Sequence, residues 1–365
     1  MDSVRGAGCL SHRMQWRKEL KERAYLLRTG KEQEEWESMA VPLITGSWID
    51  VVHPNAREGV YWNRKTLAYT DADWLTLVRH LHRDLGIELL LLQILGKEGK
   101  MIYPSKLLPT RWQTVSPDPV AAILAACAAE GVQLCLGLGY VPGGFRSEPR
   151  KAADWCRRLA EEVLERYGTR ASFAGWYLSD ELSVTDSVFN PEELAFARGL
   201  ARTLRQLTPS LPIIASPYFR GGLRKSEALA RDVAGSGVTV MAYQDGIGCT
   251  VKEPANPLRN QASFEVWKWV HDRTEVKLWA NIELFRWENG LPAEPLLPGP
   301  FPRIRAQLRA AAPFVERVVA YTVPGLMTSQ TICPDLGAPE TERLYWAYRG
   351  HRENVLAARG NGTRE

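Results

Sequence analysis

Residues 172–181 read SFAGWYLSDE, an apolar run that ends in two adjacent carboxylates. Runs that are apolar at successive positions, and not only at alternate ones, are typical of strands buried on both faces of a parallel sheet. Polar residues directly after such a strand lie at its carboxyl end, where parallel α/β barrels carry their chemistry. The segment therefore indicates both a fold class and a place for function.

Seven further segments share this pattern, and each is followed by a Gly, Pro or acidic loop and then by a longer amphipathic stretch. They are residues 41–48, 87–95, 132–140, 211–219, 238–244, 276–285 and 318–323. Regular alternation of strands with helical stretches is typical of repeated βα units. Eight such units predict an α/β protein with a single (β/α)8 TIM barrel.

Helix punctuation supports the alternation. In residues 116–131, Asp118 is placed to cap a helix, Pro119 suits its first turn and Gly131 its end. An open doubly wound sheet is the rival architecture, and it usually carries a Gly-rich phosphate loop after its first strand. The loop GSWIDVVHPNAREG contains no GxGxxG and no GxxxxGK[ST], so nucleotide binding is disfavoured.

The composition fits one large folded domain. The 365 residues are 45% hydrophobic with a net charge of +4, which excludes a disordered chain and gives no sign of a nucleic-acid partner. We expect a charged, helical N-terminal extension at 1–40, a barrel catalytic domain at 41–350 and a C-terminal tail at 351–365. No internal repeat is visible.

Several site types and locations are disfavoured by the sequence. The six cysteines form no CxxC pair and the histidines are not grouped at strand ends, so no metal site and no cofactor are expected. The first residues lack the apolar stretch of a signal peptide, which predicts a cytoplasmic protein. The longest apolar run, 87–95, is too short to cross a bilayer, so no membrane association is expected.

Two carboxylates at separate predicted strand ends are the groups that glycoside hydrolysis requires, one to protonate the leaving oxygen and one to attack carbon or activate water. Glu181 and Glu283 are the best such pair. The structural alternative is an ion pair, for example of Glu283 with Arg286. Asp245 is a third candidate catalytic acid, which would orient the pair or bind a sugar hydroxyl. Its alternative is a simple Asp-Gly turn.

Aromatic faces stack on sugar C–H surfaces, and amides and phenols bind hydroxyl groups. Side chains near predicted strand ends and in the loops that follow are therefore candidates for substrate binding. These are Trp48, Gln93, Tyr103, Tyr140, Tyr218 and Gln244.

A set of motifs in fixed order also resembles a known family. GSWID at 46–50, LLLLQ at 89–93 with YPS at 103–105, LCLGLGY at 134–140, SFAGWYLSDE, IIASPYF at 213–219, YQDGIG at 243–248 and ANIELF at 280–285 are similar to the family called domain of unknown function 4434. This family is grouped with glycoside-hydrolase-like TIM barrels, and the resemblance runs from Val41 to about Val323.

The resemblance implies roles for two residues. In retaining barrel glycosidases the acid/base follows strand four and the nucleophile follows strand seven, which corresponds to Glu181 and Glu283. The acid is usually preceded by Asn, whereas Asp180 precedes Glu181 here. This difference leaves an inverting or a transglycosylating reaction open.

The sequence thus predicts a soluble enzyme that cleaves or transfers a glycosidic bond of a carbohydrate substrate. Two other hypotheses are a non-catalytic carbohydrate-binding barrel and a barrel lyase or isomerase, for which no strand end offers a convincing Lys. The sequence does not specify the sugar, the linkage or the oligomeric state.

Overall fold

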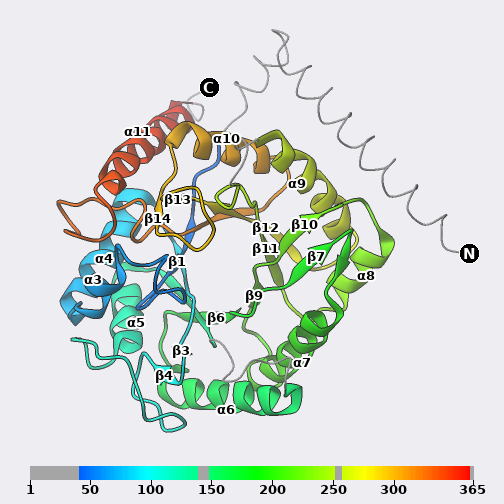
Figure 1. Ribbon diagram of the computed structural model, residues 1–365, viewed down its shortest axis with the longest axis horizontal. Coiled ribbons are helices and arrows are strands. Elements are labelled where there is room, and N and C mark those ends of the chain that lie inside the picture. The colour runs from blue at the N-terminus through cyan, green and yellow to red at the C-terminus, as the bar shows by residue number, and fades with distance from the viewer. Residues whose placement is uncertain (1–40, 139–147, 251–256, 362–365) are drawn as a thin grey trace, which may run out of the picture.

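The computed structural model describes residues 41–138, 148–250 and 257–361. Within these ranges eight parallel strands close into a barrel, and each strand pairs with its neighbours in chain order (Figure 1). The strands are β1 (Gly46–Ile49), β2 (Leu89–Leu92), β5 (Gln133–Gly137), β6 (Phe173–Leu178), β9 (Ile213–Ala215), β11 (Val240–Gln244), β12 (Lys277–Glu283) and β15 (Arg317–Tyr321). The predicted (β/α)8 barrel is confirmed, and each predicted strand segment overlaps one barrel strand.

Helices surround the barrel and cover the outer face of its strands (Figure 1). At least one follows every strand: α3 (Asn63–Leu67) and α4 (Asp71–Leu85), α5 (Pro119–Glu130), α6 (Pro149–Tyr167), α7 (Pro191–Leu207), α8 (Glu227–Ala234), α9 (Pro257–His271), α10 (Phe301–Ala311) and α11 (Glu340–Asn361). The predicted punctuation of α5 is confirmed, because Asp118 accepts a hydrogen bond from the Ala121 amide at 3.0 Å and Gly131 ends the helix at φ +73°.

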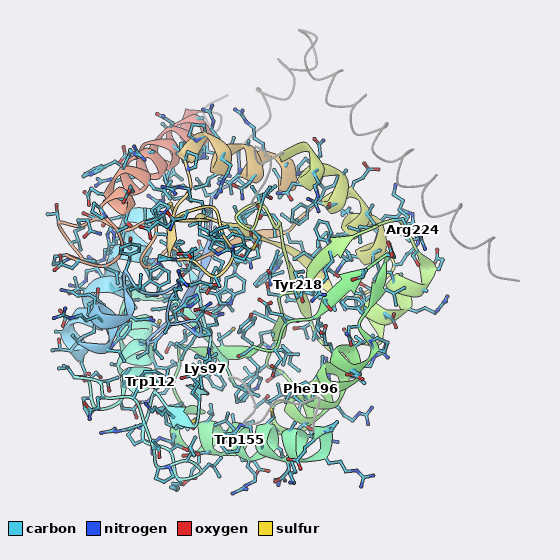
Figure 2. All side chains as sticks on the ribbon, in the orientation of Figure 1. Lys97, Trp112, Trp155, Phe196, Tyr218 and Arg224 are labelled. Carbon is cyan, nitrogen blue, oxygen red and sulfur yellow. The ribbon has the colours of Figure 1, made fainter. Side chains whose placement is uncertain are left out.

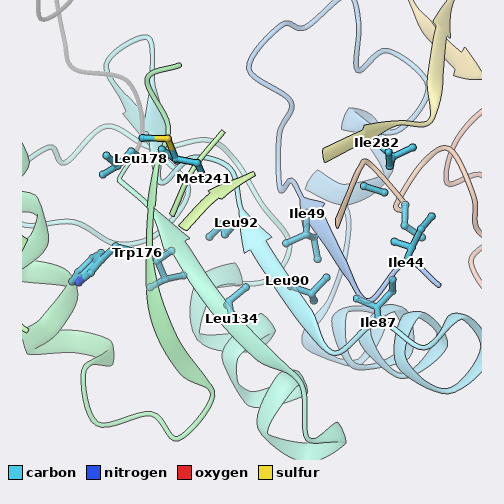
Figure 3. Packing of buried hydrophobic residues seen from close by; sticks show 14 of the residues in the cluster. Ile44, Ile49, Ile87, Leu90, Leu92, Leu134, Trp176, Leu178, Met241 and Ile282 are labelled. Atoms are coloured by element: carbon cyan, nitrogen blue, oxygen red, sulfur yellow. The ribbon is translucent and has the colours of Figure 1, made fainter. Parts of the chain in front are cut away.

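Two layers of apolar side chains hold the barrel together. Because side chains of a strand alternate between its faces, Leu89 and Leu91 point into the barrel while Leu90 and Leu92 pack under the helices. Figure 3 shows this outer layer, in which Leu90 and Trp176 lie among side chains of neighbouring strands. The inner layer also contains Trp48, Cys135, Tyr177, Ile214, Val240, Ala242 and Val319.

Three small sheets extend the carboxyl ends of barrel strands. The hairpin of β3 (Gly96–Lys97) and β4 (Lys100–Met101) follows β2. A second sheet contains β7 (Ser183–Thr185), β8 (Val188–Phe189) and β10 (Tyr218–Gly221), which follow β6 and β9. A third consists of β13 (Phe285–Trp287) and β14 (Leu296–Pro298), after β12. Of these additions, the β13–β14 sheet contributes Phe285, Trp287 and Leu296 to the wall around Glu181 and Glu283.

The predicted domain limits are only partly described. Residues 1–40 and 362–365 lie outside the described residues, so the expected charged extension stays a prediction. Helix α11 continues to Asn361, past residue 351, where the sequence predicts a tail. Its first half is anchored to the barrel, because Tyr345 and Tyr348 are fully buried and Ile44 donates its backbone N–H to the Tyr348 hydroxyl at 2.8 Å.

A pair of glycines gives a test of this packing. A Cβ added at Gly137 would overlap the backbone carbonyl oxygens of Leu92 and Gln93, whereas a Cβ at Gly199 in α7 meets nothing within 4 Å. We expect Gly137→Ala to lower the free energy of unfolding by roughly 1–3 kcal/mol, because backbone atoms cannot move aside freely. The matched Gly199→Ala change should raise it by roughly 0.5–1 kcal/mol, since alanine favours helix. Urea unfolding measures both, and equal effects would contradict the described packing.

Candidate active site

A cavity of about 270 Å³ lies at the carboxyl end of the barrel. Its polar lining consists of His53, Asn55, Glu58, Gln93, Glu181, Ser216, Gln244, Cys249, Asn281 and Glu283. Its other walls are formed by Trp48, Pro54, Tyr177, Phe285, Trp287, Leu296 and Tyr321. A concave site with aromatic walls and a few converging polar groups is typical of small-molecule binding.

Glu283 is the last residue of β12 and is held by the loop that follows β11. Its side chain is buried, and its Oε2 accepts a hydrogen bond from the Cys249 backbone N–H at 3.1 Å. The Cys249 Sγ lies 3.8 Å from Oε1. Burial raises the pKa of Glu283 to about 8, and the nearby carboxylate of Asp245 contributes, although the backbone N–H groups of Cys249 and Gly248 oppose the shift.

Glu181 follows β6 and lines the same cavity. The Gln244 Nε2 donates to its Oε1 at 2.9 Å, so β11 fixes the position of this carboxylate. The residue as a whole is exposed because it stands at the open side, but the cavity walls surround its carboxyl group. Desolvation therefore raises the pKa of Glu181, against the hydrogen bond from Gln244 and with help from the charges of Glu58 and Glu193.

Asp245 stands behind Glu283 and is not among the residues that line the cavity. Its Oδ2 accepts hydrogen bonds from Gln307 Nε2 at 2.6 Å and Asn260 Nδ2 at 3.1 Å, and its Oδ1 from the Ile247 backbone N–H at 3.1 Å. These donors on α9, α10 and the β11 loop turn the carboxylate away from the cavity. The predicted contact of Asp245 with a sugar hydroxyl is therefore not supported, whereas the alternative of orienting Glu283 fits its position.

The predicted substrate-binding residues divide into three groups. Trp48, Gln93 and Gln244 line the cavity. Tyr140 lies outside the described residues. The structure corrects the prediction for Tyr103 and Tyr218, neither of which lines the cavity.

The local structure explains both corrections. The β3–β4 hairpin carries the chain outward after β2, so Tyr103 is fully buried with its ring 5.8 Å from that of Tyr167 on α6. Tyr218 lies on β10 (Figure 2), where the strand pairs with β7 and the Tyr218 hydroxyl accepts a hydrogen bond from Arg220 at 2.8 Å. The number of residues between a tyrosine and the preceding strand end therefore did not predict where the side chains of Tyr103 and Tyr218 point.

Two parts of the cavity wall were not predicted. Glu58, in the loop between β1 and α3, accepts a hydrogen bond from Asn55 Nδ2 at 3.0 Å, and burial raises the pKa of its carboxyl group. Phe285 and Trp287 come from the β13–β14 hairpin. Aromatic residues two apart after a predicted strand end were a usable signal for the second part, whereas no motif marks Glu58.

A chain of hydrogen bonds fixes another wall. Burial lowers the pKa of His53 to about 4, so its ring is neutral. Its Nδ1 lies 2.8 Å from the Asn55 carbonyl oxygen and 2.9 Å from the Asn55 backbone nitrogen. Its Nε2 lies 2.5 Å from the Tyr321 hydroxyl, and this hydroxyl lies 3.1 Å from Gln93 Oε1. Tyr321 thereby ties Gln93 to His53 along this wall.

In residues 41–138, 148–250 and 257–361, no group of three or more His, Cys, Asp or Glu side chains is arranged to hold a metal ion. None of the helices in the described part of the chain combines the length and apolar character needed to cross a bilayer.

Comparison with known families identifies the chain. Residues 44–333 match the model of the family described as Domain of unknown function (DUF4434). The chain belongs to this family. No curated protein matches this DUF4434 chain in sequence.

Solved structures share the fold of the DUF4434 chain. A Bacteroides thetaiotaomicron VPI-5482 protein named "putative alpha-L-fucosidase" superposes with a TM-score of 0.67 at 20% identity, over 86% of this chain and 94% of that one. A beta-galactosidase from the psychrophilic Marinomonas ef1 gives 0.53 at 13% identity, over 87% and 60%. The GH99 endo-alpha-mannosidase of Bacteroides thetaiotaomicron gives 0.50 at 11% identity, over 88% and 100%. The barrel is therefore one that glycoside hydrolases use.

The environment of Glu283 predicts how stability depends on pH. Its pKa is about 8 in the folded protein and 4.5 ordinarily, so the folded state binds the proton more tightly than the unfolded state. The stability that this proton contributes is complete below pH 4.5 and is lost as the pH rises through about 8. We expect Glu283→Gln to remove this loss, so that the melting temperature of the variant minus that of the wild type increases from pH 5 to pH 8.5.

Differential scanning calorimetry across this range measures the difference. The control is Glu265→Gln on α9, where Glu265 forms an ion pair with Lys225 at 3.2 Å. A pH-independent difference for Glu283→Gln would show that the proton affinity of Glu283 is not raised.

Proposed function

We propose that this protein cleaves a glycosidic bond, with Glu181 as acid/base and Glu283 as nucleophile or base. The observation that carries the proposal is that the carboxyl groups of β6 and β12 line one cavity with aromatic walls. Two such groups are what glycoside hydrolysis needs. The barrels of the solved glycosidases support this reaction class, although a shared fold does not by itself establish an activity.

The geometry suggests how the two carboxyl groups divide the work. Glu181 stands at the open side of the cavity, where a leaving group would depart, and its raised pKa favours a protonated acid. Glu283 lies deeper, held by the Cys249 backbone N–H, which stabilises its anion. Glu181 would protonate the departing oxygen as the bond to the anomeric carbon breaks. Glu283 would attack that carbon or remove a proton from the attacking water.

Asp245 has a positioning role in this proposal. It accepts a hydrogen bond from the Glu283 backbone N–H at 3.4 Å, and its charge raises the proton affinity of Glu283. Gln307 connects the two residues, since its Nε2 also donates to the Glu283 carbonyl oxygen at 3.1 Å. The network fixes the end of β12 without reaching the cavity.

The first test of the proposal is the loss of turnover on substitution. Against a panel of aryl glycosides and oligosaccharides, we expect Glu181→Gln and Glu283→Gln each to lower kcat/KM by roughly 10²–10⁴-fold. An aryl glycoside with a strongly acidic phenol should restore much of the turnover of Glu181→Gln only, because such a leaving group departs without a proton. Glu265→Gln should retain full activity.

Other outcomes have clear meanings. Turnover that survives both glutamine substitutions would contradict the assignment. Sugar binding without turnover of any glycoside would instead favour a carbohydrate-binding barrel. The anomer released first, read by NMR, separates retention from inversion and so tells whether Glu283 attacks carbon or water.

The pH profile tests the raised proton affinity of Glu283. Its pKa is about 8 in the empty site, and the profile of kcat/KM reports the pKa values of the free enzyme. The reaction needs one proton shared between Glu181 and Glu283, and this proton is lost above the higher of their two pKa values. We therefore expect kcat/KM to fall as the pH rises through about 8. An alkaline limb far below pH 8 would contradict the raised proton affinity of Glu283.

A further inference from the structure

The described lining of the cavity holds three carboxyl groups and no cation. Glu58, Glu181 and Glu283 reach it from three different elements, and the described residues that line it include no Lys or Arg. Two cations outside the lining act on these carboxyl groups, Arg303 on Glu283 and Lys97 on Glu58. Arg303 donates to the backbone carbonyl oxygens of Glu283 at 3.1 Å and Phe285 at 2.8 Å, and Lys97 (Figure 2) forms an ion pair with Glu98 at 3.7 Å. Protonation of a glutamate would remove its charge without supplying a positive one.

The amide groups of the wall between β9 and β12 have a determined orientation. Ser216 donates its hydroxyl to the Ala242 carbonyl oxygen at 2.8 Å, so its Oγ must accept, and the group 3.1 Å away on Asn281 must be Nδ2. Gln244 faces the Glu181 carboxylate at 2.9 Å and the Ser216 carbonyl oxygen at 3.0 Å. A carbonyl oxygen only accepts, so the Gln244 group that faces it must be Nε2.

These orientations leave the amide oxygens of Asn281 and Gln244 as the unpaired polar atoms of the wall. The Asn281 side chain is 3% exposed, and its Oδ1 has no hydrogen-bond partner among the described residues. The Gln244 nitrogen already donates to Glu181 and Ser216, so only the carbonyl oxygen of this side chain remains to interact with a ligand. A buried acceptor without a partner costs free energy, which a ligand that donates a hydrogen bond to it would recover. The unpaired Asn281 Oδ1 is an observation separate from the carboxyl groups. It favours the same kind of ligand, one that donates hydrogen bonds.

The donors of the cavity are few and uncharged. The Trp48 Nε1 is buried without a partner among the described residues, and the Tyr321 hydroxyl lies 3.1 Å from Gln93 Oε1. None of these groups carries a charge that would balance an anion. A carboxylate placed here would meet like charge wherever a glutamate is ionised, and no cation among the described lining residues.

We propose that the cavity selects a glycosyl ring that carries hydroxyl or ammonium donors and no carboxylate, so that neutral or amino sugars are bound and uronic acids are rejected. This inference rests on the proposed function, because it names the substrate class of the same site. Hydroxyl and ammonium groups both donate hydrogen bonds to the acceptors of the wall. They differ in charge, and the experiment therefore distinguishes them.

The experiment compares matched sugars on the full chain by titration calorimetry. The pairs are glucose with glucuronate, galactose with galacturonate and mannose with mannuronate, and glucosamine and galactosamine test the ammonium group. We expect the neutral sugar of the best-binding pair to bind at least tenfold more tightly than its uronate. An amino sugar that binds more tightly than its parent would identify the ammonium as the preferred donor, and the reverse order would identify the hydroxyl.

A variant tests the origin of the discrimination. Glu58→Gln removes one charge and turns an acceptor into a group that can donate, so the preference for the neutral sugar should fall at least threefold. Glu288→Gln is the matched control, because Glu288 accepts a hydrogen bond from Tyr61 at 2.5 Å and does not line the cavity. Its preference should equal that of the wild type. Should Glu58→Gln fail to fold, the wild-type comparison of the matched pairs still decides the proposal.

The outcomes separate this inference from the proposed function. A uronate that binds as tightly as its neutral partner, or no binding by any sugar, overturns the inference. An unchanged preference in Glu58→Gln overturns it as well. Hydrolysis of an aryl uronide that depends on Glu181 and Glu283 would overturn it and leave the proposed function intact. Preferential binding of the neutral sugar without hydrolysis of any glycoside would support the inference and contradict the proposed function.

Discussion

The parallel arrangement of the eight strands is the constraint on which the site depends. Because all barrel strands run in one direction, every carboxyl end meets the same rim, and residues far apart in the chain converge there. The alternation of side chains then decides which of them face inward. In β12 this rule sends Trp279 into the inner apolar layer and Asn281 and Glu283 into the cavity above it. The same rule in β15 brings Tyr321 beside Glu283, its register partner.

Burial of Glu283 at this rim is unfavourable unless its polar atoms are satisfied, and the fold supplies the partners from behind. The loop after β11 provides a backbone N–H to the carboxylate, and Asp245, Asn260 and Gln307 form a closed network under it. This network leaves a second carboxylate close to the first, which increases the proton affinity of Glu283. The support that positions the residue is therefore also what shifts its protonation.

The strands, Glu181 and Glu283 were predictable, because continuous apolar runs and the polar residues that end them are local features of the sequence. The direction of other side chains was not. Tyr103 follows β2 closely, yet the β3–β4 hairpin carries it outward to α6, and Asp245 turns toward Gln307, which is 62 positions away. Glu58 reaches the cavity through a loop that has no regular pattern. Such placements depend on contacts between distant segments, which periodicity does not record.

The polar character of the wall follows from the barrel register. Gln244 and Asn281 are paired neighbours on β11 and β12, and Ser216 follows β9 on the other side. Gln244 donates to the Glu181 carboxyl group and the Ser216 carbonyl oxygen, and Asn281 donates to the Ser216 hydroxyl, so the nitrogen of each amide is used within the wall and its oxygen is left unpaired. A substitution at Ser216 would release that order, since a residue without the hydroxyl no longer holds the Asn281 nitrogen. The chemistry offered to a ligand is thus set one layer behind the cavity surface, by hydrogen bonds between adjacent strands.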